Sequence, residues 1–207
     1  MTGTATSVQE APTDDRRGDG KFDFDVIGIG AGFAGLCMIH YFRKAGLSIR
    51  VFDRAPDVGG TWAWNHYPGA ATDSESYYYC LTFSKELLQE WSWTKRYPGR
   101  EETQAYMRFV ADKCDMWPHL QFNTEITEAR FDGALGGWRV TTATGDSFTC
   151  KYFVSGMGMI SEPMIPKLKG MDRFEGPLFH SSRWPHEGLD YAGKRVGIIG
   201  AGQIGLT

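Results

Sequence analysis

Short apolar runs separated by glycines and polar residues dominate the chain from Phe22 onward. Residues 24–30 (FDVIGIG) predict a strand buried on both faces of a parallel sheet, because they are almost entirely apolar. Residues 36–45 place apolar side chains on one side of a predicted helix, and a glycine follows as its stop signal. Residues 48–53 predict a second strand. Together these elements form a strand–helix–strand unit of the kind that connects parallel strands.

The next part of the chain is less regular. Residues 58–79 are dominated by Gly, Pro, Trp, Tyr and Asn and show little periodicity. Long irregular stretches in compact enzymes are often functional, so we expect site residues there. Ser84 predicts the N-cap of a helix over residues 85–88, and apolar side chains at helical spacing predict a further helix over residues 102–116.

The pattern changes to β after Pro118. Residues 120–131, 138–142 and 147–154 predict three strands, and turn sequences containing glycine separate them. Three such strands after a strand–helix–strand unit predict a β-meander attached to a dinucleotide-binding fold. Residues 194–200 then repeat the opening pattern, an apolar strand that runs into glycines.

Composition excludes several classes of protein. The chain has 207 residues, a formal charge of −3 and 14% aromatic residues, which suits a packed core and lacks the basic stripe of a nucleic-acid binder. No run reaches the roughly 18–20 apolar residues of a membrane span, and the N-terminus lacks the apolar core of a signal peptide. No histidine has partners at metal-ligand spacing, so we expect no metal site. Wide spacing favours reduced thiols of a cytoplasmic protein for the four cysteines, which are Cys37, Cys80, Cys114 and Cys150.

The first glycine cluster matches G-x-G-x-x-G, with Gly30, Gly32 and Gly35 at the fixed positions. The first glycine permits a tight turn, the second lets backbone approach a pyrophosphate, and the third allows close helix–strand packing. The following helix N-terminus offers N–H groups and a positive dipole end to phosphates. Asp53, 18 residues after Gly35, can accept hydrogen bonds from ribose hydroxyls and disfavours a 2′-phosphate. These features predict FAD or NAD, and a glycine-rich turn without a ligand is the alternative.

Three further motifs follow in order. Residues 60–73 (GTWAWNHYPGAATD) contain Gly-x-Trp, Tyr-Pro-Gly and Asp at defined spacing. Residues 174–185 (FEGPLFHSSRWP) match F-x-G-x-x-x-H-x-x-x-W-P at every fixed position, and residues 200–205 (GAGQIG) are a second G-x-G-x-x-G. In these motifs the chain resembles the Baeyer–Villiger monooxygenases over residues 22–207. The resemblance implies an α/β fold, in which a Rossmann-like FAD-binding domain carries the β-meander and a second dinucleotide-binding domain takes NADPH.

The resemblance also implies an activity. In this family NADPH reduces FAD, the reduced flavin and O2 form a C4a-peroxyflavin, and its attack on a ketone gives an ester or lactone. The implied partners are a small ketone and O2, without nucleic acid or membrane. Asp73 is implied as the catalytic residue, since the family's Asp lies near the flavin and positions an Arg further along the chain than Thr207.

The implied cofactor residues divide between two sites. For FAD they are Gly30, Gly32, Phe33, Gly35, Asp53, Gly60, Thr61, Trp62, Asp73, Tyr79 and Ile126. For NADPH they are Gly200, Gly202 and Gly205. The family places Trp62 and Tyr79 beside the flavin and the Ile126 backbone beside the adenine. The segment with Phe174, His180 and Trp184 links the domains and is thought to couple cofactor binding to domain movement.

The same resemblance predicts the domain organisation. Residues 1–21 are expected as a disordered tail, 22–170 as the FAD-binding domain, 171–192 as an interdomain linker and 193–207 as the start of the NADP-binding domain. Only two residues follow Gly205, too few for the helix that the motif introduces. We therefore expect a truncated piece of a longer protein that is inactive by itself.

Simpler interpretations stand beside these assignments. Asp73 can cap a turn, Trp62 can be a core aromatic residue and His180 can be a hydrogen-bonded structural residue. The alternative functions are a flavin-containing monooxygenase that oxygenates nitrogen or sulfur, and a non-catalytic FAD-binding fragment. The chain also departs from the commoner family pattern. Asp53 stands where Glu is frequent and still supplies a carboxylate, and Met159 stands where a polar residue is often found.

Overall fold

A six-stranded sheet with the strand order β3-β2-β1-β6-β5-β4 forms the centre of the computed structural model, which describes residues 21–159, 162–185 and 187–200. The strands are β1 (Phe24–Ile29), β2 (Ile49–Phe52), β3 (Leu120–Gln121), β4 (Ile126–Asp132), β5 (Gly137–Thr142) and β6 (Ser147–Ser155). The α-helices are α1 (Phe33–Lys44), α2 (Thr61–Trp64), α3 (Lys85–Glu90) and α4 (Arg100–Lys113). The 3₁₀ helices are η1 (Ser76–Tyr79), η2 (Trp117–His119), η3 (Met171–Arg173) and η4 (Ser181–Arg183). This architecture confirms the predicted α/β class with a β-meander.

The parallel half of the sheet is built around β1. This strand pairs in parallel with β2 on one side and β6 on the other, and β2 pairs in parallel with β3. Val26 and Ile27 are fully buried on opposite faces of β1, as the apolar run predicts. α1 supplies the crossover to β2, so the predicted strand–helix–strand unit is confirmed. The helix begins at Phe33, three residues earlier than expected, because it starts directly after the glycine turn.

The β-meander is formed by β4, β5 and β6, which pair antiparallel. The prediction of one strand over residues 120–131 is wrong, since β3 and β4 lie at opposite edges of the sheet. The residues between them leave the strand conformation, with Asn123 at φ +52°. Their backbone is held instead by the loop after β2, where Thr124 N–H donates to Asp53 O at 2.9 Å.

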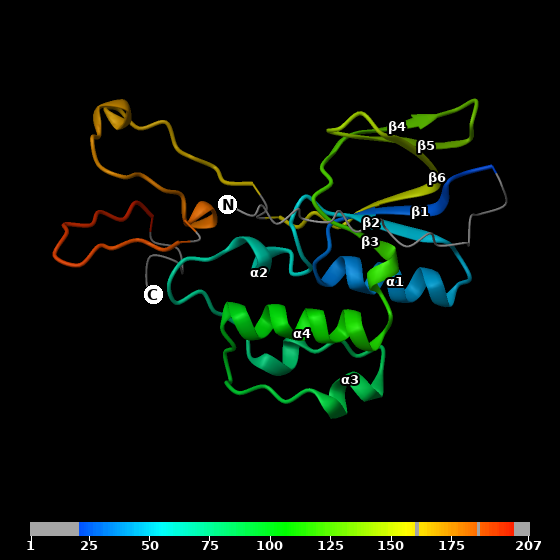
Figure 1. Ribbon diagram of the computed structural model, residues 1–207, viewed down its shortest axis with the longest axis horizontal. Helices are drawn as coiled ribbons and strands as arrows, with labels where there is room; N and C mark the ends of the chain where they lie inside the picture. Colours follow the sequence, from blue (N-terminus) through cyan, green and yellow to red (C-terminus); the bar gives the residue numbers. More distant parts are fainter. Residues whose placement is uncertain (1–20, 160–161, 186, 201–207) are drawn as a thin grey trace, which may run out of the picture.

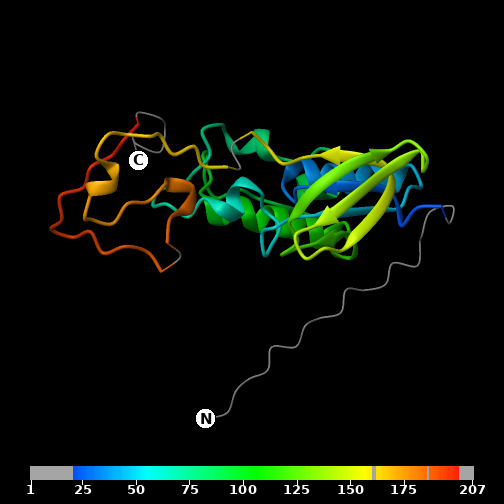
Figure 2. The same cartoon turned by 90° about the horizontal axis from the view of Figure 1, so that it is seen from above.

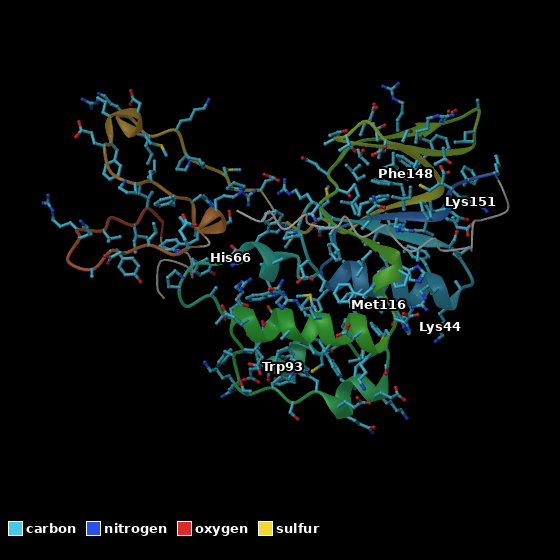
Figure 3. All side chains as sticks on the ribbon, viewed as in Figure 1. Lys44, His66, Trp93, Met116, Phe148 and Lys151 are labelled. Atoms are coloured by element: carbon cyan, nitrogen blue, oxygen red, sulfur yellow. The ribbon has the colours of Figure 1, made fainter. Side chains whose placement is uncertain are left out.

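Each face of the sheet has its own core. On one face, α1 and α4 pack on the strands around buried residues that include Leu36, Met107 and Met116. On the other face, β4 and β5 curl over β1 and β2 and enclose a second cluster around Ile27 and Phe52. Figure 1 shows α1, α3 and α4 below the plane of β1 and β2 and the meander above it. Figure 3 shows Met116 on the helical side and Phe148 on the meander side.

The remaining helices follow the expected signals with shifted ends. Ser84 caps α3, because its Oγ accepts a hydrogen bond from Leu87 N–H at 3.5 Å. α4 ends at Lys113, before the predicted boundary, and Asp115 then adopts a φ of +48° that interrupts the helix. The stretch predicted as irregular contains the short α2 and η1 between loops. Among the residues that the structure describes, no helix has the length and apolar character needed to cross a membrane.

The part of the chain after β6 differs from the sheet body. Residues 162–185 and 187–200 contain the 3₁₀ helices η3 and η4 and no strand. Figures 1 and 2 both show this part extending away from the strands and α1. The strand predicted over residues 194–200 is therefore absent from the described structure. A strand needs a neighbour for its backbone hydrogen bonds, and no described strand lies beside these residues.

Candidate functional site

The first glycine motif forms a tight turn at the carboxyl ends of three parallel strands. Gly30 follows β1, its N–H donates to Phe52 O at the end of β2, and it has a φ of +99°. A Cβ atom on Gly30 would lie 2.4 Å from the Gly156 carbonyl oxygen, directly after β6. A Cβ atom on Gly35 would lie 2.2 Å from the Gly30 carbonyl oxygen. Glycine is therefore required at Gly30 and Gly35, because any side chain would displace backbone.

A second backbone approach joins the first motif to the second. A Cβ atom on Gly32 would lie 3.3 Å from the Gly60 Cα, and one on Gly60 would lie 3.0 Å from the Gly32 Cα. Gly59 N–H donates to Ala31 O at 3.0 Å, which fixes the two loops against each other. Two motifs some thirty residues apart in sequence thus share one cradle of bare backbone.

The N-terminus of α1 opens into this cradle. Gly32 is the N-cap and makes no side-chain capping bond, and the first turn of the helix contains no acidic residue. Free N–H groups at such a terminus attract anions, and the helix dipole adds to this attraction. Close backbone approach and a positive helix end are what a dinucleotide pyrophosphate requires. The cradle therefore fits a dinucleotide.

Asp53 lies at the end of β2 and is only 8% exposed. Its Oδ2 accepts a hydrogen bond from Ala31 N–H at 2.6 Å, and its Oδ1 accepts one from Ala55 N–H at 2.8 Å. Each carboxylate oxygen can accept a second hydrogen bond, so the side chain keeps capacity for a ribose hydroxyl. The Asp53 carbonyl also accepts from Thr124 N–H, two residues before Ile126 at the start of β4. The structure thereby brings Ile126 to the same end of the site.

An aromatic cluster lies at the other end of the cradle. The Tyr79 ring centroid is 5.6 Å from that of Phe33 and 5.8 Å from that of Trp62, both with edge contacts. All three rings are half-buried. Burial raises the pKa of the Tyr79 hydroxyl, and the nearby Asp73 carboxylate raises it further. Asp73 itself is exposed, with Ser74 Oγ 3.5 Å from its Oδ1. Phe33, Trp62, Asp73 and Tyr79 are therefore brought together.

The later motifs lie outside this cluster. Phe174 is exposed, and His180 caps η4 through its Nδ1, which accepts from Ser182 N–H at 3.2 Å and lies 2.8 Å from Ser182 Oγ. Gly200 has a φ of +120° and no atom within 4 Å of a Cβ position. Gly202 and Gly205 lie outside the described residues.

Two features of the site were not predicted from the sequence. Gly156 lines the cradle. It directly follows the last strand of the meander, and this position could have identified it from the sequence. The tripeptide Tyr-Pro-Gly occurs twice, at residues 67–69 and 97–99. An antiparallel bridge between Ala71 and Gly99 joins the two loops, and they line a cavity of about 300 Å³ together with His66. Figure 3 shows His66 in the loop after α2.

Comparison with known proteins agrees with this geometry. Residues 24–207 match the flavin-binding monooxygenase-like family. The acetone monooxygenase (methyl acetate-forming) of a Gordonia strain is 46% identical over 88% of this chain and 34% of its own length. A Baeyer–Villiger monooxygenase of Pseudooceanicola batsensis is also 46% identical, over 89% of this chain and 34% of its own length. The phenazine N-monooxygenase of Lysobacter antibioticus is 43% identical over 90% of this chain and 34% of its own length.

A solved structure extends the comparison to the fold. The crystal structure of OTEMO in complex with FAD and NADP has a TM-score of 0.82 and 38% identity, over 89% of this chain and 36% of that chain. The chain thus spans about a third of the length of these relatives. The family match covers every strand of the sheet and the glycine cradle. This chain belongs to the flavin-binding monooxygenase-like family.

Proposed function

We propose that the whole protein is an FAD- and NADPH-dependent monooxygenase that inserts one oxygen atom of O2 next to a ketone carbonyl to give an ester or lactone. The observation that carries the proposal is the shared backbone cradle of Gly30, Gly32 and Gly60, with Asp53 at one end and the Trp62–Tyr79 pair at the other. The Baeyer–Villiger relative and the ketone named for the Gordonia relative support the substrate class.

Each part of the cradle has a role in holding FAD. The N-terminus of α1 and the close Gly32–Gly60 approach would bind the pyrophosphate, with Thr61 beside it. Asp53 would accept a hydrogen bond from the adenosine ribose, and the Ile126 backbone would meet the adenine. Phe33, Trp62 and Tyr79 would form an apolar wall that excludes water from the flavin ring. The bound FAD supplies the electron transfer and the oxygen chemistry.

Asp73 is the residue that we assign to catalysis. Its carboxylate is exposed at the edge of the aromatic wall and raises the pKa of Tyr79, so its charge acts within the flavin end of the cradle. A carboxylate there can orient an arginine by charge-assisted hydrogen bonds. The family resemblance supplies such an arginine in the longer protein.

We also propose the domain organisation that the family resemblance implies. Residues 22–170 would form the FAD-binding domain, 171–192 the linker, and 193–207 the start of the NADPH-binding domain with Gly200, Gly202 and Gly205. NADP in the solved relative supports the second cofactor. The four cysteines are free in the structure, which supports the proposed cytoplasmic location.

Substitution of Asp53 tests the FAD site. Asp53→Asn keeps the shape of the side chain and removes its charge, so we expect about a tenfold loss of FAD affinity, measured by quenching of flavin fluorescence. Asp53→Glu, which keeps the carboxylate, is the matched control and should retain binding. Equal affinity in Asp53→Asn and the native chain would contradict the assignment of Asp53.

Product analysis of the full-length protein tests the activity. We expect ketones to stimulate NADPH oxidation, and ¹⁸O2 to place one labelled oxygen atom in the ester or lactone detected by mass spectrometry. NADPH oxidation that ketones do not stimulate, together with unlabelled ketone recovered unchanged, would refute a Baeyer–Villiger activity.

Oxygenation of nitrogen is the second candidate. A phenazine N-monooxygenase is almost as similar to this chain as the ketone-oxidising relatives, so the shared FAD-binding part is compatible with either chemistry. Formation of an N-oxide from an aromatic nitrogen heterocycle, without ester or lactone formation from ketones in the same preparation, would favour this function.

A further inference from the structure

The side chains of Trp64, Arg54, Arg183 and Glu162 form a cluster. Trp64 is the last residue of α2, and Arg54 lies in the loop after β2. Arg183 lies in η4, and Glu162 lies near the start of the segment that follows β6. The guanidinium carbon of Arg54 is 5.3 Å from the centroid of the Trp64 ring, and that of Arg183 is also 5.3 Å away. One indole thus attracts two guanidinium groups that are far apart in the sequence.

Glu162 explains why two cations can share one ring. Two guanidinium groups beside the same indole repel each other, which would weaken both contacts. The Glu162 carboxylate forms an ion pair with Arg54 and lies 3.7 Å from Arg183 Nη2, so it offsets one of the two charges. Single exposed ion pairs contribute little to stability, whereas a shared carboxylate and a shared ring make these contacts depend on one another.

The cluster is attached to both regions that carry motifs. Arg54 directly follows Asp53, and α2 begins directly after Gly60, so the Arg54–Trp64 pair belongs to the proposed FAD cradle. Arg183 is one of the variable positions of the 174–185 motif, and the neighbouring Ser182 is buried. The contacts with Trp64 therefore hold this motif against the cradle.

We infer that Arg54 and Trp64 are positioning residues that form a receptor for the Arg183 side chain, with Glu162 as the bridging carboxylate. The receptor docks the 174–185 motif beside the FAD-binding elements. This inference rests on the proposed FAD site for its consequence: FAD that orders Asp53 and Gly60 also orders Arg54 and Trp64. By linkage, FAD binding and docking of the motif favour each other.

Hydrogen exchange of the full-length protein measures the docking directly. The probes are the amides of Arg183 and Trp184, which donate to His180 O at 2.8 Å and to Ser181 O at 3.2 Å. Trp64→Leu removes the aromatic face, and we expect about a tenfold faster exchange of these amides as η4 opens more often. Arg183→Lys keeps the charge and loses the planar group, so it should give a smaller acceleration. Glu162→Gln should also accelerate exchange, because the ion pairs of this carboxylate with the two guanidinium groups are lost.

Arg130→Lys is the matched control. Arg130 pairs with Glu128 at 3.3 Å on the surface of β4 and should leave the exchange of Arg183 and Trp184 unchanged. If Trp64→Leu and Arg183→Lys exchange at the rate of this control, the docking is refuted. Because Arg183→Lys alters a half-exposed side chain outside the core, misfolding of Trp64→Leu would still leave the test intact.

The same experiment with and without FAD separates docking from the proposed function. FAD binding is followed independently by flavin fluorescence. We expect FAD to slow the exchange of Arg183 and Trp184 in the native protein and to have a smaller effect in Glu162→Gln, because Glu162 lies outside the cradle and this variant still binds FAD. Absence of FAD binding would refute the proposed function, while the exchange of the FAD-free variants still decides the docking. Normal FAD binding without any change in exchange would refute the coupling.

Discussion

Two apolar runs of this chain precede glycine motifs, and they have opposite environments. In β1, Ile27 is fully buried and Val26 N–H donates to Ser48 O at 3.0 Å. In the second run, Val196, Ile198 and Ile199 are 65%, 68% and 72% exposed. No hydrogen bond joins residues 195–200 to any other residue that the structure describes.

The difference between these runs comes from their neighbours. β1 lies between β2 and β6, which satisfy its backbone groups on both edges, and two apolar clusters cover its faces. The run at residues 196–199 has a comparable apolar sequence and neither kind of support among the described residues. An apolar run therefore forms a strand only where the fold provides pairing partners and a surface to bury it.

The largest expected difference between the two runs is in hydrogen exchange. Amides of β1 should exchange only through global unfolding, which typically requires about 5–15 kcal/mol. Amides of residues 196–199 in the 207-residue chain should exchange close to the rate of an unstructured peptide. Mass spectrometry of peptic fragments measures both. Equal protection of the two runs would contradict the comparison.

Matched truncations of the two runs should differ in their effect on the free energy of unfolding by about 2–3 kcal/mol. Ile27→Ala removes a fully buried side chain and should lower the free energy of unfolding by about 3 kcal/mol, because it leaves a cavity. Ile198→Ala removes an exposed side chain and should change that free energy by less than about 0.5 kcal/mol. Urea denaturation followed by circular dichroism compares them. A similar loss in both variants would show that Ile198 is also packed.

Matched glycine substitutions near the two runs should show a smaller difference in the free energy of unfolding. Gly35→Ala should lower the free energy of unfolding by about 2 kcal/mol, because the added methyl group meets the Gly30 carbonyl oxygen. The same variant should lose FAD binding, since the glycine turn must shift. Gly197→Ala meets no atom within 4 Å and should be neutral in urea denaturation. Retained FAD affinity in Gly35→Ala would contradict the role of this turn.

A buried thiol in β6, beside β1, also predicts a loss of stability at alkaline pH. Burial raises the pKa of the Cys150 thiol from 9.0 to about 11. Below pH 9 both the folded and the unfolded chain keep the proton, so the contribution of the thiol is fully present. Between about pH 9 and pH 11 the unfolded chain releases the proton first, and up to about 2 kcal/mol of stability is lost.

Cys150→Ala provides the control for this pH dependence. The variant is expected to be less stable at pH 8, because a buried side chain is shortened, but its free energy of unfolding should fall less steeply between pH 8.5 and 10.5. Urea denaturation at several pH values measures both slopes. Identical slopes would show that Cys150 is not the source of the alkaline sensitivity.

Much of the fold and of the candidate site was predictable from local sequence. The glycine turn at Gly30 and Gly35, the acid at Asp53 and the cap at Ser84 depend on backbone sterics and short-range hydrogen bonds. These forces act between residues close in sequence or within one supersecondary unit. The order of the motifs was likewise sufficient to identify the family.

Contacts between distant segments were decided only by the tertiary structure. Residues 120–131 divide between two edges of the sheet because the loop after β2 captures the backbone near Thr124. The pairing of β6 with β1 brings Gly156 onto the cradle, and Trp64 contacts two arginines that are far apart in the sequence. The sequence by itself determined which local elements can form and where the glycine turn after β1 lies. Pairing and burial between segments far apart in sequence decided which apolar runs become strands, because a strand's hydrogen bonds are made to another part of the chain.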